Sequence, residues 1–454
     1  MTTPTITETA ERRRTVAVAT TGTVLALVAY TTPVGTLAAT ASALGAGPSG
    51  QAWILSSMSC GLAVALLPAG AIGDDHGRRR MFVVGALVLA AASVVATFAP
   101  DTVTLVLARV GQGLGAAAVL ACGLGLIGHV VPAGPARIRA TGVWGAGVGA
   151  GIAIGPLVAA GLAEASESGW RIPYAVLAVA AALLAVWARA GLVESTAERP
   201  RAVDGWGMLL LGLALAGLLA GLVETRAGGP GRALALLVGG ALAAVAFVAV
   251  ELRRRSPMLD LRLLRRPDFA GATVGGLATG AGVIATMSFL PTLLQRALGH
   301  DALYAALLLL GWSATSVVAA LLARRLPVSA RVQMAAGLAG TAVGQVMLAG
   351  LDGSAGALRL LPGLIVAGVA SGLLNAALGR QAVTSAPPGL ASVGSGANNT
   401  ARYLGAAVGV TIVAVLAAHP EPTAMLAGWN VAVLVDAAVS AVGALLVLAL
   451  RSAA

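Results

Sequence analysis

Eleven residues between two long apolar runs bring carboxylates and guanidiniums together: Gly70-Ala-Ile-Gly-Asp-Asp-His-Gly-Arg-Arg-Arg80. Asp74 can accept hydrogen bonds as an anion, and Gly77 can take the positive φ that a turn after a helix often needs. The segment ends in three cationic donors, Arg78, Arg79 and Arg80. A stretch this polar cannot lie in hydrocarbon. It therefore predicts a tight, charged loop at a membrane surface.

An arginine lies inside the apolar run 103–130. Helical spacing places Arg109, Gln112 and Gly113 on one face, at i, i+3 and i+4. A charge within a membrane span is costly unless it faces a wet interior or a partner. Two interpretations stay open: Arg109 belongs to an internal pathway, or its long side chain reaches the nearer membrane surface. The first is favoured because Arg109 is several residues from the end of the run.

A carboxylic acid lies in the middle of the last apolar run, 424–450. Asp436 is the one acid that the sequence places deep in hydrocarbon. Burial favours the neutral form of a carboxyl, which suits a group that takes up and releases a proton. Asp436 is therefore a candidate proton carrier, and Arg109 could stabilise its charged form if the two side chains meet. The alternative is a neutral acid that hydrogen-bonds a neighbouring helix.

The run 390–418 carries three polar groups at membrane depth, Asn398, Asn399 and Arg402. Such side chains can join helices by hydrogen bonds, each contributing roughly 1 kcal/mol. They could equally contact a substrate, and the sequence favours neither role. Asn375, in the run 358–379, is a further candidate for the lining of an internal path.

Glycines recur every four residues in the run 139–163, at Gly147, Gly151 and Gly155. A line of glycines on a helix lets another backbone approach closely. Pro156 follows directly, removes one helical hydrogen bond and permits a bend. This run is therefore expected to be a close-packing surface.

The elements that carry these residues must cross a membrane. The chain has 454 residues, of which 58% are hydrophobic and 10% charged, whereas a soluble domain carries about 25% charged residues. The net charge of +11 does not imply a nucleic-acid partner, because most of the arginines lie in short loops between apolar runs. Metal-ligand spacings of histidine and the phosphate-binding pattern G-x-x-x-x-G-K-(S/T) are both missing from the sequence, so no cofactor is expected.

Fourteen apolar runs of spanning length are predicted. They lie near residues 15–39, 51–72, 80–99, 103–130, 139–163, 172–191, 205–224, 233–252, 268–293, 302–323, 331–350, 358–379, 390–418 and 424–450. Arginines concentrate in alternate loops, which predicts cytoplasmic N- and C-termini. The spacing divides the chain into 1–191 with six spans, 192–267 with cytoplasmic loops and two linker spans, and 268–454 with six more.

Four of these patterns resemble signatures of the major facilitator superfamily. They are the Gly70–Arg80 segment, the R-x-x-Q-G pattern that starts at Arg109, the ending Gly155-Pro156-x-x-Ala159-Ala160, and the N-x-x-R-x-x-G pattern from Asn399 to Gly405. The division into six, two and six spans resembles the fourteen-helix drug:proton antiporter branch. The chain departs from the superfamily at Asp75, where a basic residue is usual, and at Ala29, where the branch usually carries an aspartate.

The resemblance implies an all-α membrane protein with a substrate path between two six-helix bundles that rock by alternating access. It also implies that Asp74 faces the start of the thirteenth helix near Gly389–Ser392. We therefore expect a monomeric secondary exporter in a bacterial cytoplasmic membrane, coupled to protons, for hydrophobic or amphipathic drugs or antibiotics. Ala29 keeps an alternative open, a metabolite exporter or uniporter without proton coupling. An enzyme would need a polar catalytic cluster, which the sequence does not contain.

Overall fold

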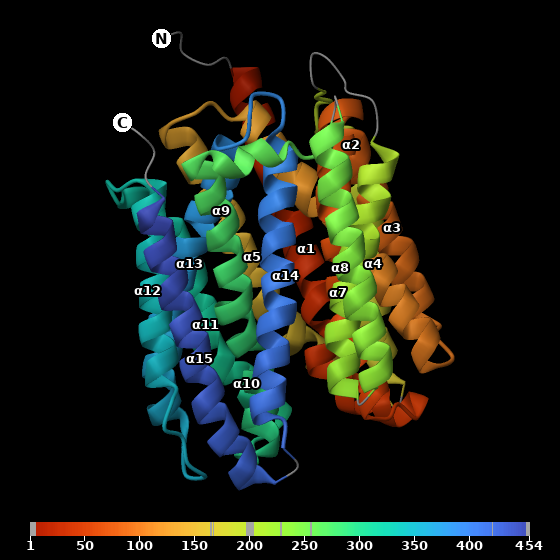
Figure 1. Ribbon diagram of the computed structural model, residues 1–454, viewed down its shortest axis with the longest axis vertical. Coiled ribbons are helices and arrows are strands. Elements are labelled where there is room, and N and C mark those ends of the chain that lie inside the picture. Colours follow the sequence, from red (N-terminus) through yellow and green to blue (C-terminus); the bar gives the residue numbers. More distant parts are fainter. Residues whose placement is uncertain are drawn as a thin grey trace.

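The computed structural model describes residues 6–163, 166, 168–196, 204–227, 229–254, 257–419 and 421–450. Within these ranges all regular secondary structure is helical, and fourteen helical rods stand side by side (Figure 1). Thirteen of the rods are long and apolar enough to cross a membrane. Helices suit this environment because they satisfy their own backbone hydrogen bonds where water is absent.

The first six rods pack against one another and form what we call the N-terminal group. They are α1 (Ile6–Leu44), α2 (Pro48–His76), α3 (Arg78–Thr97), α4 (Thr102–Val130), α5 (Pro135–Ala163) and α6 (Ile172–Gly191). Local chemistry sets several helix starts. Asp101, for example, caps α4 by accepting a hydrogen bond from the backbone N–H of Thr104 at 2.8 Å.

The next two rods, α7 (Gly205–Ala227) and α8 (Pro230–Arg253), form a hairpin that lies against α2 and α14 (Figure 1). Leu211 and Leu215 of α7 share one apolar cluster with Leu67 of α2 and with Val393 and Ala397 of α14. The hairpin therefore covers the line along which α2 meets α14.

The last six rods form the C-terminal group. One continuous rod contains α9 (Pro267–Ala278), the π-helix η3 (Thr279–Ile284) and α10 (Ala285–Arg296). The others are α11 (Ala302–Leu322), α12 (Ala330–Met347), α13 (Ala357–Thr384), α14 (Ala391–Ala417) and α15 (Pro422–Ala449). A large apolar cluster between residues 278 and 447 holds this group together.

Each predicted span corresponds to one rod, so the prediction of an all-α membrane fold is confirmed. Two details differ. The rod α12 is too polar for the criteria that the other thirteen meet, because its 18 residues include Arg331, Gln333 and Gln345. The π-helix inside the ninth rod has no signal in the sequence. The prediction of orientation also used four arginines that lie outside the described residues: Arg199, Arg201, Arg255 and Arg451.

The two groups meet along two seams, α2 with α14 and α5 with α11. Helix α1 begins and α15 ends at the same end of the molecule (Figure 1). At that end, Gly70 lies against the carbonyl of Ser392 in one seam, and Gly142 lies against the carbonyl of Ala320 in the other. The groups are therefore in contact at the end where α1 begins and α15 ends, which we call the closed end.

Candidate functional site

The charged segment predicted as a loop is almost entirely helical. Helix α2 continues to His76 and α3 begins at Arg78, so Gly77 alone separates them. Its φ of 126° lies in the region that favours glycine, as predicted. A Cβ at Gly77 would also lie 3.0 Å from the carboxylate of Glu194. Helix α3 can begin in this polar stretch because the carboxylate of Glu194 accepts from its first backbone N–H groups.

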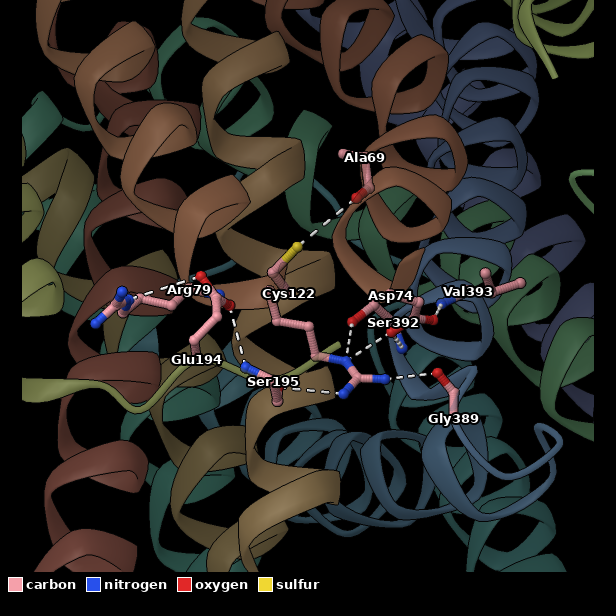
Figure 2. Close-up of polar contacts among 10 residues, drawn as sticks. Ala69, Asp74, Arg79, Cys122, Glu194, Ser195, Gly389, Ser392 and Val393 are labelled. Carbon is pink, nitrogen blue, oxygen red and sulfur yellow. Dashed lines mark hydrogen bonds and ion pairs between the residues drawn. The ribbon is translucent and has the colours of Figure 1, made fainter. Parts of the chain in front are cut away.

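Asp74 is fully buried at the closed end and binds the N-terminus of α14 (Figure 2). Its Oδ1 accepts from the backbone N–H of Ser392 at 3.1 Å, and its Oδ2 accepts from that of Val393 at 2.8 Å. The first amides of a helix lack helical partners and carry partial positive charge, so they are good donors to an anion. Asp74 thereby joins the two helix groups across the α2/α14 seam.

Arg78 completes this contact and is also buried. Its Nε donates to Oδ1 of Asp74 at 2.6 Å and to Oγ of Ser392 at 3.2 Å. Its Nη2 donates to the carbonyl of Gly389 at 2.6 Å, and its Nη1 to Oγ of Ser195 at 3.2 Å (Figure 2). We call Asp74, Arg78, Gly389, Ser392 and Val393 the latch.

The other two arginines of the segment serve a different purpose. Glu194 accepts from the backbone N–H groups of Arg79 at 2.9 Å and Arg80 at 3.2 Å, and so caps α3. The guanidiniums of Arg79 and Arg80 are partly or largely exposed, and each lies 3.7 Å from Glu194, a separation at which exposed ion pairs contribute little. Sequence reasoning missed Glu194 and Ser195, because no local pattern connects them with residues more than a hundred positions away.

The glycine line on α5 packs against α1, as its spacing predicts. A Cβ at Gly147 would meet Thr20, one at Gly151 would meet Leu27, and one at Gly155 would meet Thr31. This contact joins two helices within the N-terminal group. Pro156, the next residue along, instead lines the central cavity described below.

Arg109 is fully buried in the N-terminal group. Its guanidinium donates to three backbone carbonyls, those of Ile54 at 2.8 Å, Ala29 at 3.2 Å and Tyr30 at 3.2 Å. It also donates to Oε1 of Gln112 at 3.2 Å. The side chain therefore ties α4 to α1 and α2, and it does not extend to a membrane surface.

Asp436 lies in a buried polar network of the C-terminal group. Its Oδ2 is 2.6 Å from Oγ1 of Thr286, which accepts from Nε2 of Gln345 at 2.9 Å. The same Nε2 donates to the carbonyl of Gly282 at 3.1 Å, and Oγ of Ser440 donates to Oε1 of Gln345 at 3.0 Å. Gly282 belongs to the π-helix, whose altered hydrogen bonding is typical of functional positions.

Arg109 and Asp436 are not brought together. All hydrogen bonds of Arg109 go to the N-terminal group, whereas the partner of Asp436 is Thr286 in the C-terminal group. The stabilising contact considered from the sequence is therefore missing in this conformation.

A cavity lies between the two groups at mid-height. Its polar and aromatic lining consists of Tyr30, Thr31, Trp144, Ser288, Trp312, Ser313, Ser316, Ser371, Asn375, Asn399, Arg402 and Tyr403. The remaining walls are mostly Leu, Val, Ile, Ala, Met and Pro, and the empty volume is about 1140 Å³ including the opening to solvent. On α11 the lining reaches Ala306, near the helix start that lies away from the closed end. The cavity is therefore shut off on the latch side and extends toward the opposite end.

The three polar residues of α14 divide between the two roles left open by the sequence. Nδ2 of Asn398 donates to the carbonyl of Ala272 in α9 at 2.6 Å, which is helix-to-helix bonding. Asn399 bonds back to Ser395 of its own helix and lines the cavity. Arg402 lines the cavity as well, as does Asn375 of α13.

Comparison with known proteins places these features in a family. A model of the Major Facilitator Superfamily matches residues 19–410. The chain is 34% identical to the probable actinorhodin transporter of Streptomyces coelicolor, over 82% of this chain and 67% of that protein. It is 31% identical to the cephamycin export protein CmcT of Amycolatopsis lactamdurans, over 85% and 82%. The fold matches that of the proton:xylose symporter XylE with a TM-score of 0.70, at 15% identity and over 96% and 95% of the two chains.

Proposed function

The chain belongs to the major facilitator superfamily, and from this premise we propose that it is a secondary exporter of hydrophobic or amphipathic compounds. It is a multi-pass membrane transporter, not an enzyme. The observation that carries the proposal is the largely apolar cavity between the two helix groups, closed at one end by the latch. The relative named for cephamycin export supports the direction of transport.

We assign the moving parts to the divisions expected from the sequence. Residues 1–191 and 268–454 rock against each other as two bundles, and 192–267 supplies the linker hairpin, as in the fourteen-helix branch. Opening of the latch end and closure of the opposite end would present the cavity to each side in turn. Because both seams form within one chain, a monomer is sufficient for this cycle.

The closed end is proposed to face the cytoplasm, on the basis of the arginine-rich loops. Reporter fusions or single cysteines at Ser166, Ala227 and Gly353 should then report the outside. A cytoplasmic signal from any one of the three positions would overturn this orientation.

Proton coupling is proposed to use Asp436. The Thr286 hydroxyl has one proton but lies within hydrogen-bond distance of two acceptors, Oδ2 of Asp436 at 2.6 Å and the Gly282 carbonyl at 3.0 Å. When Asp436 is ionised, Thr286 can donate to it. When Asp436 is protonated, the acid can donate to Thr286, which then donates to Gly282. Thr286 can therefore form a hydrogen bond with Asp436 in either protonation state, as expected of a partner of a proton carrier.

The Asp436 network is also connected to the cavity through a shared helical rod. Val283, Ile284 and Met287, on the same rod as Thr286, line the cavity wall. A change in the Asp436 network would therefore act directly on a helix that contacts the substrate path.

Asp436→Asn tests this proposal, because asparagine resembles the protonated acid. Inverted vesicles should lose dye accumulation driven by a pH gradient, whereas dye binding to the purified variant should remain. Asp352→Asn is the control: hydrogen bonds from Ser354 lower the pKa of Asp352, which lies outside the spans and stays ionised near neutral pH.

The control variant should transport normally. Gradient-driven accumulation unchanged in Asp436→Asn would leave Asp436 as a group that joins helices. The second candidate, an exporter or uniporter without proton coupling, would then be favoured by the buried Ala29 at the usual acid position.

A further inference from the structure

We propose that the central cavity binds compounds with a single negative charge, and that Arg402 is the group that recognises this charge. The inference rests on the proposed exporter function and names its substrate class. Arg402 lies on α14, is 7% exposed and lines the cavity. Among the described residues no acid lines this cavity, and Arg402 has no hydrogen bond or ion pair with any of them.

An unpaired guanidinium in this position needs a partner. A buried charge is costly when nothing compensates it, and intramembrane cations usually pair with acids or backbone carbonyls. Arg109 illustrates the usual solution, because three carbonyls surround its guanidinium. Arg402 has no such set of partners in the described chain, so its donors remain available to a ligand in the cavity.

Two residues that line the cavity carry buried polar atoms without a partner among the described residues. Nε1 of Trp144 on α5 is a buried donor without an acceptor, and Oδ1 of Asn375 on α13 is a buried acceptor without a donor. Buried polar groups are almost always hydrogen-bonded, and these two lie one on each helix group. A ligand that bonded to both would bridge the groups and would couple binding to their relative movement.

The rest of the lining fits a flat, apolar body. The rings of Tyr30 on α1 and Tyr403 on α14 pack edge to face, with their centroids 5.8 Å apart. Trp312 lines the same cavity. Aromatic and aliphatic walls with few polar groups are typical of sites for small organic ligands. The ligand class is therefore an aromatic or polycyclic compound with one acidic group, and positively charged compounds should be excluded.

Three pyrene probes isolate the effect of charge. 1-Pyrenebutyrate, 1-pyrenebutyramide and 1-pyrenebutylamine share one ring and chain but carry a negative, a neutral and a positive head group. Binding to purified protein in nanodiscs is measured by pyrene fluorescence, with empty nanodiscs as the background. The butyrate should bind more tightly than the amide by roughly ten- to a hundredfold, the range expected for hydrogen bonds to a charged group, and the amine should bind most weakly.

Variants at Arg402 then assign the preference. Arg402→Gln should bind butyrate and amide equally, and retained amide binding shows that the variant is folded. Arg402→Lys keeps the charge and should keep part of the preference. Arg296→Gln, at an exposed arginine outside the cavity, should behave as wild type.

Equal binding of the three probes by wild type, or an unchanged preference in Arg402→Gln, would overturn the inference. Transport of the probes into inverted vesicles separates this outcome from failure of the proposed function. If all three probes are exported equally, the proposed exporter function stands and the selection by charge is refuted. If the protein binds the butyrate selectively but exports none of the probes, the anion site stands and the proposed exporter function is refuted.

Discussion

The two seams between the helix groups close the same end of the molecule by different means. In the α2/α14 seam, Asp74 accepts hydrogen bonds from the first backbone N–H groups of α14, and Arg78, its buried ion-pair partner, donates to the carbonyl of Gly389 just before that helix. The α5/α11 seam uses close packing of small residues, with Gly142 against Ala320 and Gly149 against Ser316. Directed hydrogen bonds to buried charges have one good geometry, whereas small apolar surfaces can slide. We therefore expect the first seam to define the closed state and the second to accommodate movement.

The largest effect should come from removing the charge of the latch. Asp74→Asn leaves Arg78 buried without its anion, and breaking a buried pair costs about 3–5 kcal/mol. The closed state should lose population, and the export rate should fall at least about tenfold. An added Ser395→Cys substitution reports this opening, because Ser395 is fully buried beneath the latch. The introduced thiol should become reactive toward N-ethylmaleimide when it is combined with Asp74→Asn.

Asp101→Asn is the matched control, because it changes the same atoms at the start of α4, where asparagine caps a helix equally well. Export at the wild-type rate in Asp74→Asn, with the introduced thiol still protected, would refute the latch.

Adding one methyl group to each seam by a glycine-to-alanine substitution tests the difference between the seams directly. A Cβ at Gly70 would clash with the backbone of Ser392, which can move only if α2 and α14 separate. A Cβ at Gly149 would lie 3.2 Å from Cγ2 of Val317 and 3.3 Å from Oγ of Ser316, side-chain atoms that can shift. Gly70→Ala should reduce export severalfold, and Gly149→Ala should stay close to wild type. Equal losses in the two variants would contradict the difference between the seams.

The smallest effect is expected where the linker hairpin covers the first seam. Leu215→Ala removes buried contacts from the cluster shared with Val393 and Ala397. Since lipid tails are as apolar as leucine, only packing contacts are lost, and export should fall by less than about twofold. Leu242→Ala, on the exposed face of α8, should change neither export nor thermal stability. A loss as large as that of Asp74→Asn would mean that the hairpin, not the latch, holds the seam closed.

Hydropathy was sufficient to predict the fourteen rods, because apolar length is a local property of the sequence. The family resemblance also correctly predicted that Asp74 faces the start of α14. The sequence could not predict the partners of Arg79, Arg78 and Asp436. These partners, Glu194, Ser195 and Thr286, lie more than a hundred residues away along the chain.

Helix rotation was equally hidden from the sequence. Asn398 and Arg402 are one turn apart on α14, yet the first bonds to α9 and the second faces the cavity. Their side chains point according to how α14 packs against several helices at once, and periodicity within one run does not determine that packing.

The hairpin α7–α8 makes the two flanks of the molecule differ toward the lipid. It shields the α2/α14 seam from acyl chains, whereas Val143 and Val318, on α5 and α11, remain exposed on the outer surface. Lipid therefore contacts the packed α5/α11 seam directly, whereas the hairpin stands between lipid and the α2/α14 seam. A roughly twofold arrangement of helices thus presents two unlike flanks to the bilayer.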